Sequence, residues 1–160
     1  MSVRAFIGLG SNLDAPAARV SRAFADLARI PATTLIATSP LYANPPFGPV
    51  AQGEFVNAVA AIDTALTPRA LLVELRRIEA AHGRVRDGTR WGPRTLDLDI
   101  LVFGDLELDE PDLHLPHRGL TERNFVLYPL ADLAPDLVLP RYGALTSLLA
   151  RCSSEGLRRL

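Results

Sequence analysis

The chain has 160 residues, with 17 cationic and 18 anionic side chains, a net charge of −1 and one cysteine. All of the cations are arginine, which excludes a P-loop and a lysine Schiff base. The near-neutral charge argues against general nucleic-acid binding, and no apolar run approaches the roughly 18 residues of a membrane span. We expect one cytoplasmic domain over residues 1–160, because the length fits a single core and Cys152 has no disulfide partner.

A strand, a helix and a second strand are predicted at the start of the chain. Residues 3–10 alternate between apolar and other side chains, which is typical of a strand. Asp14 and Pro16 indicate a helix start, as an N-cap and an early proline, and Pro31 ends that helix. Residues 33–39 are rich in β-branched side chains and predict the second strand.

Two long loops separate the regular elements that follow. Proline and glycine are frequent in residues 40–54, which predicts an irregular loop, and a strand follows over 55–63. Thr67 precedes a proline and begins a helix that ends at Gly83. A second, polar loop covers residues 84–94.

A strong strand over residues 95–103 completes the order β-α-β-β-α-β. This order favours an α+β fold with a ferredoxin-like core, in which helices pack on an antiparallel sheet. The remaining chain is a C-terminal extension, with a hairpin or extended pair at 106–115, a helical piece at 127–133 and a helix at 145–149.

Two acidic residues, Asp97 and Asp99, are expected to share one face of that last strand, because alternate side chains point the same way. Adjacent carboxylates repel each other unless a cation lies between them. Mg²⁺ typically takes one or two carboxylates together with phosphate oxygens. A solvated acidic face is the alternative interpretation. The side chains expected on the opposite, core face are Leu96, Leu98, Ile100 and Val102.

Arginine is concentrated just before the acidic strand. Guanidinium groups suit bidentate contact with phosphate oxygens, so an acidic pair beside an arginine-rich loop indicates a divalent metal and a polyphosphate held together. A solvated basic loop is the alternative for the arginines alone. The cluster consists of Arg76, Arg77, Arg84, Arg86, Arg90 and Arg94.

Aromatic and amide side chains suggest a second ligand. Phe55 and Asn57 share a strand face, and Trp91 lies in a polar loop, so stacking and amide hydrogen bonds suit a heterocycle with an amide edge. Core positions for both aromatic residues are the alternative. His117 and Arg123 are further candidates from the other side of the sheet, and a structural role for the histidine stays open.

Several of these segments together resemble one enzyme family, the 6-hydroxymethyl-7,8-dihydropterin pyrophosphokinases of folate biosynthesis. The resemblance runs collinearly from Phe6 to about Pro140, and the run R-W-G-P-R-T-L-D-L-D-I is highly specific. The matching segments are residues 6–13, 45–49, 55–57, 83–86, 90–100 and 115–117.

The resemblance implies transfer of pyrophosphate from ATP to the pterin hydroxymethyl group, giving AMP, with two Mg²⁺ ions on Asp97 and Asp99. It implies a monomer whose partners are these small molecules, with no nucleic acid or membrane. The implied catalytic residues are Arg84, Arg94, Asp97 and Asp99. The implied pterin contacts are Asn44, Pro45, Phe47, Phe55, Asn57, Trp91 and Phe125. The implied ATP contacts are Arg76, Arg77, Glu79, Arg86, Arg90, Arg94, Ile100, His117 and Arg123.

The chain also departs from the family pattern. Phe55 stands where tyrosine is common, and Arg76 stands where glutamine is common. The variable positions on the adenosine side hold Asp112, His114 and Arg118. Two alternatives from other classes remain: a ferredoxin-like RNA-binding module, and a regulatory nucleotide binder without turnover.

Overall fold

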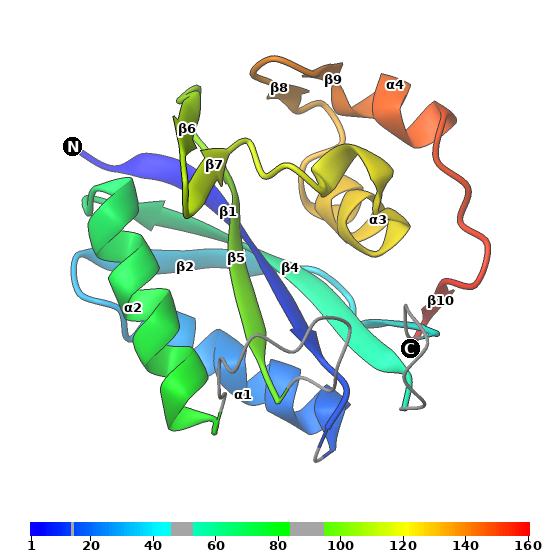
Figure 1. Cartoon of the computed structure of the whole chain (residues 1–160), viewed down its shortest axis with the longest axis horizontal. Helices are drawn as coiled ribbons and strands as arrows, with labels where there is room; N and C mark the ends of the chain where they lie inside the picture. The colour runs from blue at the N-terminus through cyan, green and yellow to red at the C-terminus, as the bar shows by residue number, and fades with distance from the viewer. Residues whose placement is uncertain (14, 46–52, 84–94) are drawn as a thin grey trace.

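A computed structural model describes residues 1–13, 15–45, 53–83 and 95–160 of the chain. Within these residues, an antiparallel six-stranded sheet forms the centre of the fold, with strand order β10-β3-β4-β1-β5 and β2 also paired to β4 (Figure 1). The strands are β1 (Val3–Ser11), β2 (Thr33–Thr38), β3 (Tyr42–Asn44), β4 (Phe55–Thr64), β5 (Asp97–Phe103) and β10 (Arg158–Arg159).

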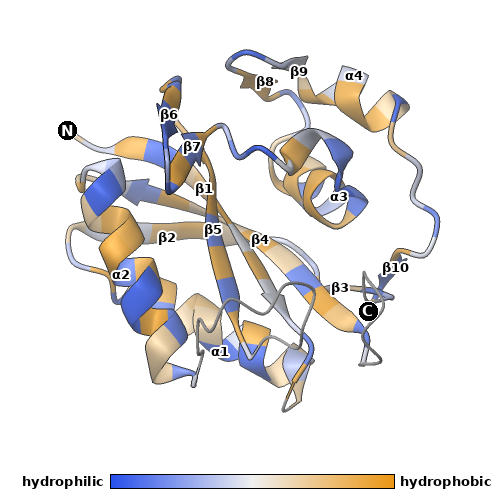
Figure 2. Cartoon of the chain, in the orientation of Figure 1, coloured by the Kyte–Doolittle hydropathy of each residue, from blue (hydrophilic) through white to orange (hydrophobic). Residues whose placement is uncertain are grey.

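Helices cover both faces of this sheet. The first pair, α1 (Pro16–Ala28) and α2 (Pro68–Ala81), packs on one face through a core that includes Leu27 and Leu75. The second pair, α3 (Asn124–Leu133) and α4 (Leu145–Ala150), packs on the other face through a separate apolar cluster. Figure 2 shows the apolar residues gathered on the strands and on the helix faces that meet them.

The predicted ferredoxin-like core is confirmed. The elements β1, α1, β2, β4, α2 and β5 follow the predicted order, and β1 and β4 pair with each other in the middle of the sheet. The Thr67 hydroxyl accepts a hydrogen bond from the Ala70 N–H, so the predicted N-cap of α2 is also confirmed. No helix in the described ranges is both long enough and apolar enough to cross a membrane.

The C-terminal extension contains the predicted hairpin, formed by β6 (Leu108–Glu110) and β7 (Leu113–Leu115). A short 3-10 turn, η1 (Leu120–Glu122), leads into α3, which begins at Asn124 and thus three residues before the predicted helical piece. A second small pair, β8 (Val138–Leu139) and β9 (Gly143–Ala144), was not expected from the sequence.

Three local predictions are wrong. The predicted irregular loop 40–54 contains β3, because this segment pairs with both β4 and β10. The N-cap of α1 is Ala15, at φ 57°, and not Asp14. Val102 does not share a face with Leu98, because a β-bulge lies between them.

A β-bulge interrupts the alternation of β5. Ile100 and Val102 face successive residues of β1, which leaves Leu101 as an extra residue. As a result, Leu101 and Val102 both pack towards α3 and α4, whereas Leu98 packs towards α1 and α2. The first half of β5 keeps its regular alternation, and that half carries the acidic pair.

Candidate active site

The acidic pair lies at the start of β5. Leu96 and Leu98 are fully buried in the cluster under α1 and α2, so Asp97 and Asp99 face the opposite side of the sheet, as predicted. Both carboxylates border a cavity of about 50 Å³ on this side, which we call the sheet cavity. Its lining is Gly8, Leu9, Gly10, Asn57, Ala58, Asp97, Asp99, Leu101, His117, Arg123, Phe125 and Val126.

Two glycines of β1 lie directly beside the carboxylates, because Gly10 pairs with Asp97 and Gly8 pairs with Asp99. A Cβ atom on Gly10 would lie 2.7 Å from the Asn57 Oδ1 atom, so this glycine leaves room for the amide. These glycines were not among the predicted site residues. The signal that could have revealed them is glycine at alternate positions of an otherwise apolar strand.

A second cavity of about 220 Å³, which we call the hairpin cavity, adjoins the first at Asp99 and His117. It lies between α2 and the β6–β7 hairpin. Its lining is Leu72, Arg76, Asp99, Ile100, Asp112, Leu113, His114, His117 and Arg118. Leu72 and Leu113 were not predicted as site residues, because an apolar residue in a helix or strand carries no signal that distinguishes a cavity wall from a core position.

Asn57 is fixed by a neighbouring amide. The Asn57 Nδ2 atom donates a hydrogen bond to Asn44 Oδ1, and both side chains are buried. Asn44 in turn pairs with Phe55 across β3 and β4, so the neighbouring strand β3 holds the amide in place. The structure therefore brings Asn57 and Phe125 to one cavity, while Asn44 and Phe55 lie next to it.

Glu79 attaches α2 to the acidic strand. Its side chain is only 1% exposed, and its Oε2 atom accepts a hydrogen bond of 2.8 Å from the Leu98 N–H. Arg76 Nη1 donates to both Glu79 carboxylate oxygens at 3.2 Å and to the Leu98 carbonyl at 3.1 Å. Because Leu98 lies between the two aspartates, these contacts set the position of both carboxylates.

His117 presents an N–H to the sheet cavity. Its Nδ1 atom accepts a hydrogen bond of 3.0 Å from the Gly119 N–H, so the neutral ring carries its proton on Nε2. That Nε2 atom lies 3.9 Å from Asp99 Oδ1. Burial, followed by the nearby Arg123 cation, lowers the pKa of His117 to about 4, so the ring is neutral near pH 7.

Arg123 and Phe125 are held against each other at the start of α3. The guanidinium carbon of Arg123 lies 5.9 Å from the centre of the Phe125 ring, which is within the range of a cation–π contact. A Cβ atom on Gly119 would lie 2.5 Å from Arg123 Nε, so the glycine makes room for this arginine. One cation and one flat ring thus face the acidic pair together.

The charged form of Asp99 is disfavoured in the structure. Burial, and secondly the charge of Asp97, raise the pKa of Asp99 to about 7, and the Arg76 cation only partly offsets this. A carboxylate with a raised pKa beside a second carboxylate gains stability when a cation binds between them.

A pH-dependent stability follows from this shift. Because the folded chain holds the Asp99 proton more tightly than the unfolded chain, the free energy of unfolding without metal falls as pH rises from about 4 to about 7. We expect Asp99→Asn to stabilise the chelator-treated protein by about 1–3 kcal/mol at about pH 8, a range reduced because the side chain is 32% exposed, and to change it little at about pH 4. Urea denaturation at both pH values measures this. Asp105→Asn, at an exposed carboxylate, is the control, and an equal gain at both pH values would contradict the prediction.

The two carboxylates of Asp97 and Asp99 suit Mg²⁺, provided that other ligands complete its coordination. Two carboxylates supply the oxygen ligands that this ion prefers. Across residues 1–13, 15–45, 53–83 and 95–160, no group of three or more acidic, histidine or cysteine side chains is arranged to hold a metal ion. Asp97 and Asp99 would therefore hold Mg²⁺ together with oxygens from substrate and water, which is its usual coordination beside phosphates.

The remaining predicted site residues take different positions in the structure. Arg77 is 69% exposed, pairs with Glu74 on the surface of α2, and lines neither the sheet cavity nor the hairpin cavity. Pro45, with Asn44, lines a third cavity of about 520 Å³ beside α3. Ile100 lines the hairpin cavity. The candidates that lie outside the described residues are Phe47, Arg84, Arg86, Arg90, Trp91 and Arg94.

Comparison with known proteins gives one consistent family. Residues 6–135 match the family model described as 7,8-dihydro-6-hydroxymethylpterin-pyrophosphokinase. A Pseudomonas aeruginosa protein named 2-amino-4-hydroxy-6-hydroxymethyldihydropteridine pyrophosphokinase is 54% identical over all of this chain and 98% of its own length. A Haemophilus influenzae protein of the same name is 42% identical over 99% of this chain and 98% of its own length.

Solved structures agree on the fold. A wild-type HPPK-DHPS from Plasmodium falciparum, crystallised with pteroate, superposes with a TM-score of 0.74 at 16% identity and covers 94% of this chain. The chain spans 42% of that longer protein, so this likeness concerns the fold alone. The family model and the sequence relatives confirm the predicted resemblance: the chain belongs to the 7,8-dihydro-6-hydroxymethylpterin-pyrophosphokinase family.

Proposed function

We propose that the chain transfers the pyrophosphoryl group of ATP to the hydroxymethyl oxygen of 6-hydroxymethyl-7,8-dihydropterin, a step in folate biosynthesis. The observation that carries this proposal is the position of Asp97 and Asp99, which face a cavity containing a flat ring and an amide on one side. On the other side, that cavity adjoins a second one large enough to take part of a nucleotide. Two substrates can therefore meet over one pair of carboxylates.

The pterin is proposed to bind at the end formed by Asn57 and Phe125. The Phe125 ring offers a stacking surface, and the amide of Asn57, fixed by Asn44, suits the amide-like edge of the heterocycle. Phe55 lies beside this end, and the family resemblance adds Pro45, Phe47 and Trp91.

The triphosphate is proposed to lie across the acidic pair. Its negative oxygens would receive hydrogen bonds from the neutral His117 ring through Nε2 and from the Arg123 guanidinium. Arg76 borders the same region from α2. The resemblance adds Arg84 and Arg94 as catalytic cations, and Arg86 and Arg90 as further ATP contacts.

Magnesium would be held by Asp97 and Asp99, and two ions are proposed from the family resemblance. When bound, Mg²⁺ neutralises phosphate charge and polarises the phosphoryl oxygens. Glu79 and Arg76 act through Leu98, because their hydrogen bonds to its backbone fix the spacing of the two carboxylates.

In the reaction, the hydroxymethyl oxygen attacks the β-phosphorus while the bond from that phosphorus to the bridging oxygen of the α-phosphate breaks. AMP leaves with that oxygen, and the hydroxyl proton passes to water. The protein contributes mainly position and charge, which is the usual basis of phosphoryl-transfer catalysis.

The identity of the products tests this proposal. With ATP, Mg²⁺ and the reduced pterin, chromatography should show AMP and the pterin pyrophosphate in equal amounts, and chelation of the metal should stop their formation. Formation of ADP would indicate monophosphoryl transfer and contradict the proposal. Absence of any turnover would favour a regulatory nucleotide binder.

An RNA-binding module is less consistent with the site. RNA-binding sheets of this class present stacking aromatics and a basic face. Here the corresponding face carries Asp97 and Asp99, which would repel a phosphate backbone in the absence of a bound cation. We also propose that the enzyme acts as a monomer in the cytoplasm, and sedimentation analysis of the purified chain tests its oligomeric state.

A further inference from the structure

The last residues of the chain run beside the end of the site where the pterin is proposed to bind. We call residues 153–160 the C-terminal tail, and Figure 1 shows it crossing from the end of α4 to β10, where it pairs with β3. Residues 153–156 are exposed, and Ser153 and Glu155 line the cavity of about 520 Å³ beside α3. Polar contacts, and not apolar packing, therefore hold this part of the C-terminal tail.

The C-terminal tail is attached to the start of α3. Asn124 Nδ2 donates hydrogen bonds to the carbonyls of Ser153 and Glu155, at 3.0 and 3.1 Å. Asn124 directly precedes Phe125, whose ring is the proposed stacking surface for the pterin. The position of this ring is therefore linked to the position of the C-terminal tail.

The C-terminal tail is also attached to the start of β4. Arg158 Nη1 and Nη2 donate to the Oε2 and Oε1 atoms of Glu54 at 2.8 and 3.1 Å, which is a two-point contact. Glu54 directly precedes Phe55, the aromatic residue beside the pterin end. The C-terminal tail thus bridges the two segments that carry Phe55 and Phe125.

Two further contacts lie between and beyond these attachments. A Cβ atom on Gly156 would lie 3.4 Å from Pro45 Cδ, so the tail backbone passes close to Pro45. The guanidinium carbon of Arg159 lies 5.7 Å from the centre of the Tyr42 ring, and Arg159 Nη2 donates to Asp132 Oδ1 at 3.0 Å. The C-terminal tail therefore contacts β3, β4 and α3, the three elements that carry or adjoin the described pterin candidates.

We propose that the C-terminal tail holds the start of β4 and the start of α3 at the spacing that a pterin ring requires, and that Arg158 and Asn124 are the positioning residues of this bridge. A stacked ring gains most of its attraction at contact distance, so a slot that can widen binds the ring less tightly. The triphosphate and the metal are proposed to bind over the acidic pair, so their binding does not depend on the bridge. This inference rests on the proposed function, because it takes the pterin as the ring that is bound.

The test measures KM separately for the two substrates. Arg158→Ala and Asn124→Ala should each raise KM for the reduced pterin by about fivefold, the effect expected from losing one exposed polar contact. KM for ATP and kcat should stay within about twofold of their values in the unchanged protein. A general loss of structure would change all three quantities together, and that result would overturn the inference.

The double variant tests whether the two contacts belong to one bridge. Breaking either attachment already releases the bridge, so Arg158→Ala combined with Asn124→Ala should raise KM for the pterin little more than the larger single change does. Additive effects would show two independent local contacts and overturn the inference. Exchange of the charges, with Glu54→Arg and Arg158→Glu together, should restore most of the affinity that Arg158→Ala loses.

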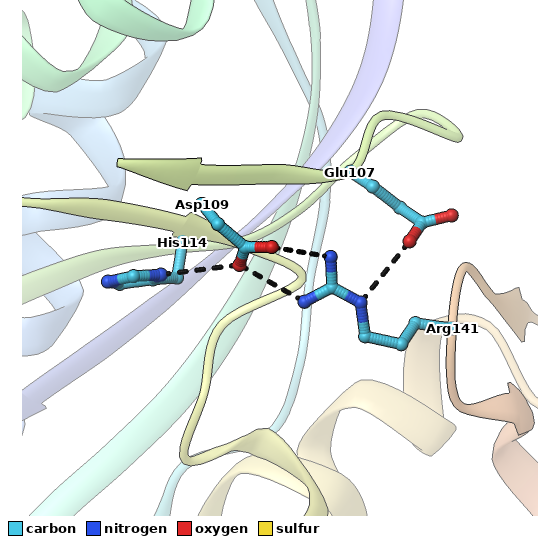
Figure 3. A network of polar contacts seen from close by, with 4 residues as sticks. All are labelled: Glu107, Asp109, His114 and Arg141. Atoms are coloured by element: carbon cyan, nitrogen blue, oxygen red, sulfur yellow. Dashed lines mark hydrogen bonds and ion pairs between the residues drawn. The ribbon is translucent and has the colours of Figure 1, made fainter. Parts of the chain in front are cut away.

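Two other arginines provide matched controls. Arg4 makes a two-point contact with Asp63 near the far end of β4. Arg141 makes a two-point contact with Asp109 at the β6–β7 hairpin, elsewhere in the C-terminal extension (Figure 3). Arg4→Ala and Arg141→Ala should leave KM for the pterin unchanged. An equal rise in these variants would show that loss of any surface ion pair has this effect, and it would overturn the inference.

Pterin binding, measured by calorimetry with Mg²⁺ and the α,β-methylene analogue of ATP present, gives a readout that needs no turnover. Should Asn124→Ala fail to fold, as seen by circular dichroism, Arg158→Ala and Glu54→Gln provide the test, because these side chains are 59% and 48% exposed. Unchanged pterin affinity in these variants would overturn the inference and leave the proposed function standing. If the unchanged protein bound the ATP analogue but no pterin, the proposed function would be wrong, and the inference with it.

Discussion

Replacing Asp97 with alanine is expected to lower kcat on the order of 1000-fold, because the change removes an oxygen ligand for Mg²⁺ where phosphate charge must be stabilised. The fold should be kept or made more stable, since the charge of Asp97 raises the pKa of Asp99 and that repulsion would be relieved. AMP formation at saturating ATP and pterin measures the loss, and thermal unfolding without metal measures the stability.

Asp105→Ala is the matched control for this prediction, because Asp105 is an exposed acid just beyond the same strand. It should leave both quantities close to those of the unchanged chain. If Asp97→Ala retained its activity, the acidic pair would not be the metal site. If it unfolded, the carboxylate would have a structural role in place of, or besides, metal binding.

The second large effect concerns stability. Glu79→Ala is expected to lower the free energy of unfolding by about 3 kcal/mol, because it leaves the buried Leu98 N–H without its acceptor and the Arg76 guanidinium without its carboxylate partner. Urea denaturation at about pH 7 measures this change. Any activity that remains should also fall, since Leu98 would no longer hold the two aspartates at their spacing.

Two variants sharpen the interpretation. Glu74→Ala removes an acid from the same helix whose partner, Arg77, is largely exposed, and it should cost no more than about 0.5 kcal/mol. Glu79→Gln keeps an oxygen acceptor for the Leu98 N–H and should lose less than Glu79→Ala. Equal losses in Glu74→Ala and Glu79→Ala would show that the buried position of Glu79 contributes nothing special.

The local periodicity of the sequence predicted a large part of the site. Alternation in β5 placed Asp97 and Asp99 on the face opposite Leu98, and the structure agrees. The same rule failed three residues after Asp99, at Val102, because residues 100–103 are all apolar. An apolar run carries no information on which face each residue takes, so the bulge at Leu101 left no trace in the pattern.

Contacts between distant parts of the chain explain the other failures. Residues 42–44 form β3 although the segment around them is rich in proline, because β4 and β10 pair with them from both sides. Similarly, Asn124 begins α3 while its amide donates to the carbonyls of Ser153 and Glu155, near the end of the chain. A prediction from neighbouring residues alone cannot include these partners, because they lie far away in the sequence.

The surroundings of the hairpin cavity were also predicted only in part. The sequence marked Arg76 and His117 as candidates, because charge and imidazole chemistry are visible in a residue type. It did not reveal that Arg141 lies beside Asp109, about 30 residues earlier, because that contact depends on the packing of the C-terminal extension.

The pairing of β10 with β3 has a consequence for self-association. An uncovered outer strand offers a row of backbone donors and acceptors to which another polypeptide can add. Arg158 and Arg159 pair with Ala43 and Tyr42, and the Leu160 N–H bonds to the Leu41 carbonyl at 2.9 Å, so the chain covers this row with its own backbone. Trimming these last residues would uncover a template for intermolecular sheet growth next to Asn44. A purification handle is therefore better attached at Met1, which is fully exposed.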